Sequence, residues 1–134
     1  MVVVHIVLFK FREDTPKEIT TKFLEELRNL KHLPCVVDQK LVVGGPSITT
    51  PVARSKGFHF CLLSYHKDRQ ALDEYQASPE HHDVTTNYMW PFNDDLMRFD
   101  FETDDDFMAD ANGSGPPQGV IDAALVKSFN AYDD

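Results

Sequence analysis

The sequence of 134 residues is poor in basic side chains and contains no long apolar run. Lysine and arginine number 13 against 22 aspartate and glutamate residues, so the formal net charge is −9. Proteins that bind nucleic acid present a basic surface, and this balance therefore argues against a nucleic-acid partner and against anionic membrane surfaces. The acidic excess is uneven, because Asp104–Asp106 and Asp133–Asp134 lie late in the chain.

Cysteine is also scarce. Cys35 and Cys61 are too few for a disulfide framework, and no CxxC pair is present, so we expect two buried, reduced thiols. The apolar N-terminal stretch is too short to cross a bilayer and lacks the charged region and the cleavage site of a signal peptide. These features predict a cytoplasmic protein with no membrane partner.

The short motifs that hold common cofactors are missing as well. The sequence contains no HExxH, no phosphate-binding loop, no GxGxxG and no GxSxG. The run His81-His82-Asp83 is consecutive, and neighbours on a helix point about 100 degrees apart, so these side chains do not converge on one ion. We therefore expect neither a metal nor an organic cofactor.

The first twelve residues are rich in β-branched and aromatic side chains, which predicts a strand that is apolar on both faces. One face carries Val3, His5, Val7, Phe9 and Phe11, and the other carries Val2, Val4, Ile6 and Leu8. A strand of this kind must be covered on both sides.

The following residues predict alternating helices and strands as far as residue 101. The expected elements are a helix that begins at Thr15-Pro16, includes Lys31 and His32 at its C-terminal end and is stopped by Pro34, a strand over 36–44, a strand over 57–66, a short helix capped by Asp68, a helix opened by Ser78-Pro79, and a strand over 96–101. This order predicts an α+β fold of the ferredoxin-like type, a four-stranded antiparallel sheet with helices on one face.

No further strand remains to cover the second face of that sheet. We infer a homodimer in which two sheets pack face to face as a dimeric α/β barrel. The barrel domain is predicted over residues 1–103. Residues 104–134 are predicted to form an acidic tail, in which 120–129 either forms a short amphipathic helix or remains loosely held.

Three polar residues stand out in apolar surroundings, and each has two interpretations. His5 is either a hydrogen-bonded core histidine or a general base. His81, near the positive end of its helix, is either a neutral proton acceptor or part of the cap. Tyr75 is either a core aromatic with a hydrated hydroxyl or a buried phenol that needs a partner. His66 and His82 are expected to be solvated, and His59 and Phe60 to point to opposite faces.

Several segments resemble the stress-responsive dimeric α/β-barrel family over about residues 1–102. They are His5 followed by VLFKF, Gly57-Phe58, the run from Ala71 to Tyr75 leading to Ser78-Pro79-Glu80-His81, and Phe99-Asp100-Phe101. The resemblance implies a homodimer of two four-stranded sheets. Some members are named only for stress response, whereas others are enzymes without organic cofactors, including plant members that cyclise a polyketide chain or cleave hydroxynitriles.

The resemblance also implies a site. In the family's polyketide cyclase, a strand-one histidine, a tyrosine before the turn and a histidine after it line the pocket, and these match His5, Tyr75 and His81. Two positions depart from that pattern: Phe60, not His59, matches a strand-three histidine, and Leu27 falls at or near a tyrosine. The implied pocket is lined by some or all of Phe23, Leu27, Phe60, Tyr88 and Trp90.

Three hypotheses for the function follow. The first is a cofactor-free acid–base enzyme for an apolar, aromatic or polyketide-type intermediate, in which His5 or His81 takes a proton and Tyr75 binds the oxyanion in cyclisation, dehydration or C–C lyase chemistry. The second is a non-catalytic stress-responsive homodimer that binds a small apolar ligand or simply resists stress, with His5 hydrogen-bonded to Tyr75. The third is an accessory protein whose tail recruits a partner. The first requires a closed pocket of roughly a few hundred Å³.

Overall fold

The structure is a computed structural model, and it describes residues 1–104. These residues form one compact unit, Met1–Asp104. The helix predicted over 120–129, and the acidic tail beyond Asp104, lie outside the described residues. None of the helices within 1–104 is long and apolar enough to cross a membrane.

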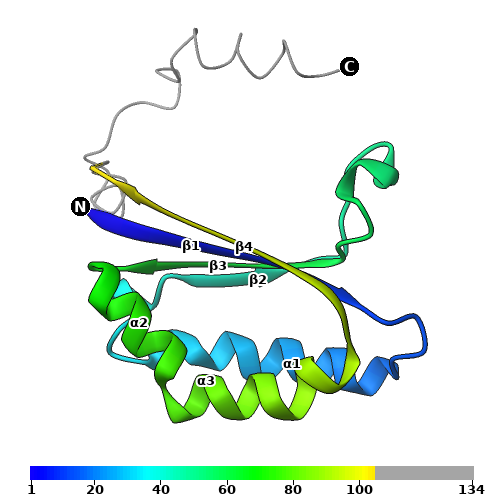
Figure 1. Cartoon of the computed structure of the whole chain (residues 1–134), viewed down its shortest axis with the longest axis horizontal. Coiled ribbons are helices and arrows are strands. Elements are labelled where there is room, and N and C mark those ends of the chain that lie inside the picture. Colours follow the sequence, from blue (N-terminus) through cyan, green and yellow to red (C-terminus); the bar gives the residue numbers. More distant parts are fainter. Residues whose placement is uncertain (105–134) are drawn as a thin grey trace, which may run out of the picture. The chain divides into compact units, whose positions relative to one another are not determined.

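The described unit is a four-stranded antiparallel sheet in the order β2-β3-β1-β4 with helices on one face (Figure 1). The strands are β1 (Val2–Phe11), β2 (Leu41–Gly44), β3 (Phe60–His66) and β4 (Asn93–Thr103). The helices are α1 (Lys17–Asn29), α2 (Arg69–Ala77) and α3 (Pro79–Val84). The α+β, ferredoxin-like prediction is confirmed.

Several predicted boundaries differ from the structure: β3 begins at Phe60 rather than at residue 57, and β4 spans Asn93–Thr103 rather than 96–101. Two others are wrong for local reasons. Pro16, with ψ of 141°, is still extended, so α1 begins one residue later than predicted and Thr15 does not cap it. The strand predicted from Val36 begins only at Leu41, because Asp38 and Gln39 take positive φ angles of 48° and 57° in a 3₁₀ turn. The short side chain of Asp38 tolerates this left-handed conformation, which is incompatible with an extended strand at these two residues.

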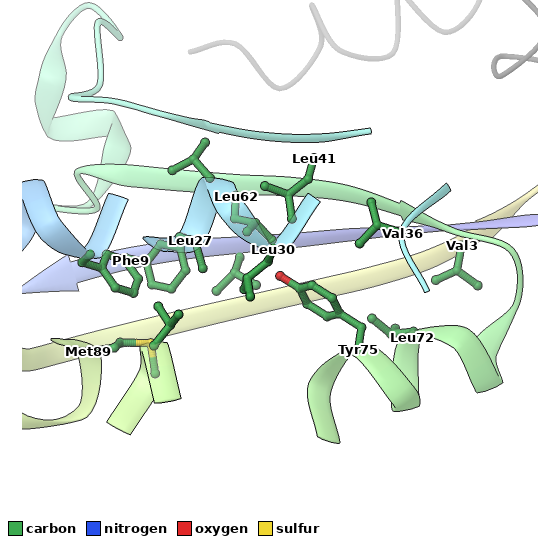
Figure 2. Close-up of a cluster of buried hydrophobic side chains, with 14 of the residues drawn as sticks. Val3, Phe9, Leu27, Leu30, Val36, Leu41, Leu62, Leu72, Tyr75 and Met89 are labelled. Atoms are coloured by element: carbon green, nitrogen blue, oxygen red, sulfur yellow. The ribbon is translucent and has the colours of Figure 1, made fainter. Parts of the chain in front are cut away.

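The core lies between the helices and the sheet (Figure 2). Phe23 of α1 is fully buried, and its ring meets those of Phe9 and Phe11 edge-on, with centroids 5.1 and 5.3 Å away. This geometry is the one that aromatic quadrupoles favour. His5 belongs to the same face of β1 and is 1% exposed.

The opposite face of the sheet is apolar and open within the described residues. On β4 the apolar residues Met97, Phe99 and Phe101 lie on the face without helices. They pair with Leu8, Ile6 and Val4 of β1, respectively. Phe99 is 62% exposed. The charged residues of β4 alternate with them and therefore share the helix-bearing face with His5. An exposed apolar patch of this kind is typical of an interface.

Candidate functional site

The centre of the candidate site is His5, which β1 places beneath the helices. Asp100 lies directly opposite on β4, and His5 donates its Nδ1–H to Asp100 Oδ1 over 2.5 Å. Since a carboxylate only accepts hydrogen bonds, this contact leaves Nε2 of the neutral imidazole as the proton acceptor. Burial lowers the pKa of His5, and the hydrogen bond to Asp100 opposes that shift.

Tyr75 reaches the same region from α2. Asp68 caps this helix by accepting from the Ala71 N–H, as predicted, and the helix turns Leu72 and Tyr75 toward the core. Figure 2 shows the Tyr75 hydroxyl directed toward the sheet, on the side of Leu27 and Leu30. The hydroxyl is buried and has no hydrogen-bond partner in residues 1–104. Burial raises the pKa of the phenol, which keeps its proton.

The hydrogen bond between His5 and Tyr75 that the non-catalytic hypothesis required is not formed. Their rings meet edge-on with centroids 5.8 Å apart, and the Tyr75 oxygen has no partner in the described part of the chain. His5 instead donates to Asp100. A buried hydroxyl left unpaired costs about 1–3 kcal/mol, so the site holds a donor for which residues 1–104 supply no acceptor.

His81 approaches from α3, whose start follows the prediction. Ser78 accepts from the His81 N–H over 3.2 Å, and Pro79 occupies the first turn. The His81 ring packs edge-on against Tyr75 with centroids 5.0 Å apart. Burial lowers its pKa to about 4, with smaller contributions from positive charge on His5, His82 and Arg98. The imidazole is therefore neutral at neutral pH, and burial is the main cause.

The prediction that His66 lies in solvent is wrong. It is fully buried, donates from Nδ1 to the Cys35 carbonyl over 2.7 Å, and accepts at Nε2 from the Ser64 hydroxyl over 2.8 Å. Its ring lies 4.9 Å from that of Tyr75. The period-2 alternation of β3 could have predicted this burial. Ser64 pairs with His5, and His66, two residues further along β3, lies on the same face as both. His82, in contrast, is exposed as predicted.

His5, Tyr75 and His81, but not His66, line one cavity of about 130 Å³. It is lined by His5, Val7, Phe9, Phe23, Leu27, Leu62, Tyr75, Gln76, His81, Thr85, Met89, Trp90, Leu96 and Arg98. The structure thus brings together His5, Tyr75, His81, Phe23, Leu27 and Trp90. The cavity is smaller than the predicted few hundred Å³. No group of three or more possible metal ligands occurs within residues 1–104.

Two of the residues proposed for the pocket do not line it. Phe60 packs against Phe11, with ring centroids 6.0 Å apart, and is absent from the cavity wall. Tyr88 lies in the Thr85–Met89 segment, which winds as a π-helix. The wider turn shifts the face of the helix, so that Met89 takes the place on the cavity wall expected for Tyr88. His59 is exposed and stays outside the site.

Comparison with known proteins shows which family has this fold and sequence. Residues 3–103 match the family model described as the stress responsive A/B barrel domain. The chain belongs to this family. A curated relative, a stress-response A/B barrel domain-containing protein of Arabidopsis thaliana, is 30% identical over 106 residues, which cover 77% of this chain. The same alignment spans 37% of the Arabidopsis protein, so this A/B barrel chain corresponds to little more than a third of that relative.

Solved structures show the same fold at low identity. The hydroxynitrile lyase of Passiflora edulis aligns with a TM-score of 0.65 at 15% identity, over 75% of this chain and 91% of the enzyme. A dimeric ferredoxin-like protein of unknown function from Thermobifida fusca gives 0.64 at 16%, over 77% and 92%. A Dabb family protein from Mesorhizobium loti gives 0.62 at 16%, over 76% and 96%. These likenesses concern the fold alone.

Proposed function

We propose that this A/B barrel domain is a cofactor-free acid–base enzyme for a small apolar or aromatic carbonyl compound. One observation carries the proposal: a buried proton acceptor, a second neutral imidazole and a buried hydroxyl donor that has no partner among the described residues line one cavity. Titratable groups with shifted pKa values that meet in a cavity mark functional sites. The residues concerned are His5, Tyr75 and His81.

In the proposed reaction, Nε2 of His5 takes a proton from the carbon next to the substrate carbonyl. The C–H bond breaks, the N–H bond forms, and the electron pair moves onto the carbonyl oxygen as an enolate. The Tyr75 O–H donates to that oxygen, and Asp100 stabilises the imidazolium that forms. In cyclisation the enolate attacks a second carbonyl, and the imidazolium of His5 returns its proton to the alkoxide that forms. In dehydration the imidazolium protonates the departing β-hydroxyl, which leaves as water, and the neutral imidazole is restored in both cases. C–C cleavage is the reverse of the cyclisation step.

The cavity sets the size of the group that reacts. An apolar protein cavity of about 150 Å³ holds a benzene molecule, and the volume here is about 130 Å³. The buried part of the substrate is therefore about one aromatic ring or a short acyl chain. A polyketide-type intermediate, the substrate class implied by the resemblance to olivetolic acid cyclase, fits this proposal if only its reacting end enters.

The proposal predicts exchange of carbon-bound hydrogen. In D₂O the protein is expected to exchange the methyl protons of acetophenone, a ketone with one ring, faster than buffer alone, as measured by proton NMR. His5→Ala should lower that rate by about 10²–10⁴-fold, the usual contribution of a general base. His81→Ala tests the second imidazole, and His59→Ala, on the exposed histidine, is the matched control. Equal rates in all three variants contradict the assigned roles.

A non-catalytic homodimer that binds a small apolar ligand is the second candidate. The modest volume and the largely apolar wall of the cavity favour it. It predicts that acetophenone binds to the wild type without any exchange of its protons, so the same NMR sample separates the two functions.

We also infer that a second copy of the chain covers the open face of the sheet. Phe99, which is 62% exposed opposite Ile6, lies in this apolar patch, and the related protein from Thermobifida fusca is dimeric. Light scattering should show a dimer of the wild type and a monomer of Phe99→Glu, because a charge buried between two sheets is costly. Trp90→Glu, at a site 58% exposed among the helices, should remain dimeric. A monomeric wild type contradicts the inference.

Two further expectations stay predictions. The cytoplasmic location is one. The other is that the acidic segment 104–134 recruits a partner enzyme, which deletion of that segment would test by loss of partner binding.

A further inference from the structure

The cavity is buried at one end and open to solvent at the other. Phe23, Tyr75 and His5 are at most 1% exposed. Trp90 is 58% exposed, and the Arg98 side chain is 54% exposed, although both line the same cavity. A ligand therefore enters beside Trp90 and Arg98 and places its inner part against the buried imidazole and phenol.

Arg98 carries the only permanent charge on the cavity wall among the described residues. It lies opposite Val7 on β4, two residues before Asp100, so both side chains share the helix-bearing face. Arg98 Nε lies 3.4 Å from Asp100 Oδ2. A guanidinium has five N–H donors in a planar fork, and a contact through Nε leaves the outer edge of the fork able to bind a second acceptor.

The positive charge of Arg98 is unfavourable for two imidazoles that are proposed to accept protons. Burial is the main cause of the lowered pKa values of His5 and His81, and positive charge on Arg98 makes a minor contribution in the same direction, which weakens both imidazoles further as proton acceptors. An apolar side chain in its place would avoid this penalty while keeping the wall of the cavity closed. An anionic group of the ligand beside Arg98 would remove the penalty when the ligand binds.

The net negative charge of the chain also explains why an anionic ligand would need Arg98. The chain carries a formal net charge of −9, which repels anionic ligands in general. A single arginine at the mouth of an apolar cavity gives a local site where a carboxylate can form charge-assisted, bidentate hydrogen bonds.

We propose that Arg98 binds a carboxylate of the ligand, so that the site accepts a small carboxylated compound with its ring or acyl group inside and its carboxylate at the mouth. This inference rests on the proposed function, because it names the substrate class for the same cavity. It makes Arg98 a specificity-determining residue and leaves the proton transfer to His5.

Benzoate and benzamide are suitable probes, because they have nearly the same shape and differ in charge. Calorimetric titration of the full chain at low salt is expected to show benzoate binding about tenfold more tightly than benzamide, the usual advantage of a charge-assisted pair. The advantage should shrink as sodium chloride is added, since the mouth is exposed to solvent.

Arg98→Met should remove the preference for benzoate and leave benzamide binding within about twofold of the wild type. Arg98→Lys should keep part of the preference, because it retains the charge but not the fork. Arg12→Met is a matched control: Arg12 is 51% exposed and also contacts an aspartate, Asp14, through Nε, at 3.2 Å, but lies outside the cavity. This variant should behave as the wild type.

The outcomes separate this inference from the proposed function. His5→Ala should lose proton exchange and still prefer benzoate, so a wild type without exchange but with that preference contradicts only the proposed chemistry. Equal affinity of the wild type for the two probes, no binding of either at millimolar concentration, or loss of the preference in Arg12→Met would overturn the role of Arg98.

Discussion

Replacement of Asp100 by asparagine is expected to lower the rate of proton exchange by on the order of 10²–10⁴-fold, with little change in overall structure. Asp100 accepts the Nδ1–H of His5 over 2.5 Å and so determines which nitrogen is free to take the substrate proton. An asparagine side chain can donate its N–H₂ to Nδ1 instead, which moves the imidazole proton to Nε2. The carboxylate charge that stabilises the imidazolium is also lost.

The measurement is the NMR exchange rate with acetophenone, with far-UV circular dichroism to verify folding. Asp94→Asn is the matched control, because Asp94 lies on the same strand, is 53% exposed, and contacts Lys10 rather than a histidine. A rate in Asp100→Asn within about threefold of the wild type would mean that the tautomer of His5 does not matter, and the assigned base would then be wrong.

The second large effect concerns stability in acid. The pKa of His81 is about 4 in the folded protein, against an ordinary value of 6.5. The unfolded chain therefore binds more protons at this group between pH 6.5 and 4, and the free energy of unfolding falls as the pH is lowered through that window. With allowance for the partial exposure of the ring, His81 alone is expected to remove about 2 kcal/mol. Above pH 6.5 it contributes no pH dependence.

Urea unfolding of the wild type and of His81→Leu at several values between pH 4 and 7 checks this expectation. The variant should lose less stability on acidification than the wild type, by about 2 kcal/mol, while burial also lowers the pKa values of His5 and His66 in both proteins. His82→Leu, which changes the exposed neighbour, should follow the wild type. Parallel curves for the wild type and His81→Leu would show that His81 titrates normally in the folded state.

Local patterns predicted the fold and part of the site well. Asp68 and Ser78-Pro79 begin α2 and α3 as expected, because a cap depends on a side chain and on backbone N–H groups within three residues of it. The alternation of β1 placed His5 on the same face as the core residues Val7 and Phe9. The predicted set His5, Tyr75 and His81 lines one cavity, although the roles of these residues stay a prediction.

The failures arise where a residue's environment depends on distant parts of the chain. The sequence places His66 at the end of a strand, where solvent is expected, but the Cys35 carbonyl, 31 positions away, covers it. A regular helical period predicts Tyr88 on the pocket wall, and the π-helix over Thr85–Met89 breaks that period. Alternation shows which residues of a strand share a face, but it does not show which of the two faces is buried. A shift of the register by one residue exchanges the two faces.

The sequence by itself determined the order of the elements, the starts of α2 and α3 and the two apolar faces of β1, because these depend on neighbouring residues. Only the tertiary structure decided that the charged face of β4 meets His5, so that Asp100, 95 positions along the chain, orients the imidazole and Arg98 lies at the mouth of the cavity. The reason is physical: strand pairing sets which of two alternating faces is buried, and that choice is made by contacts between segments far apart in the chain.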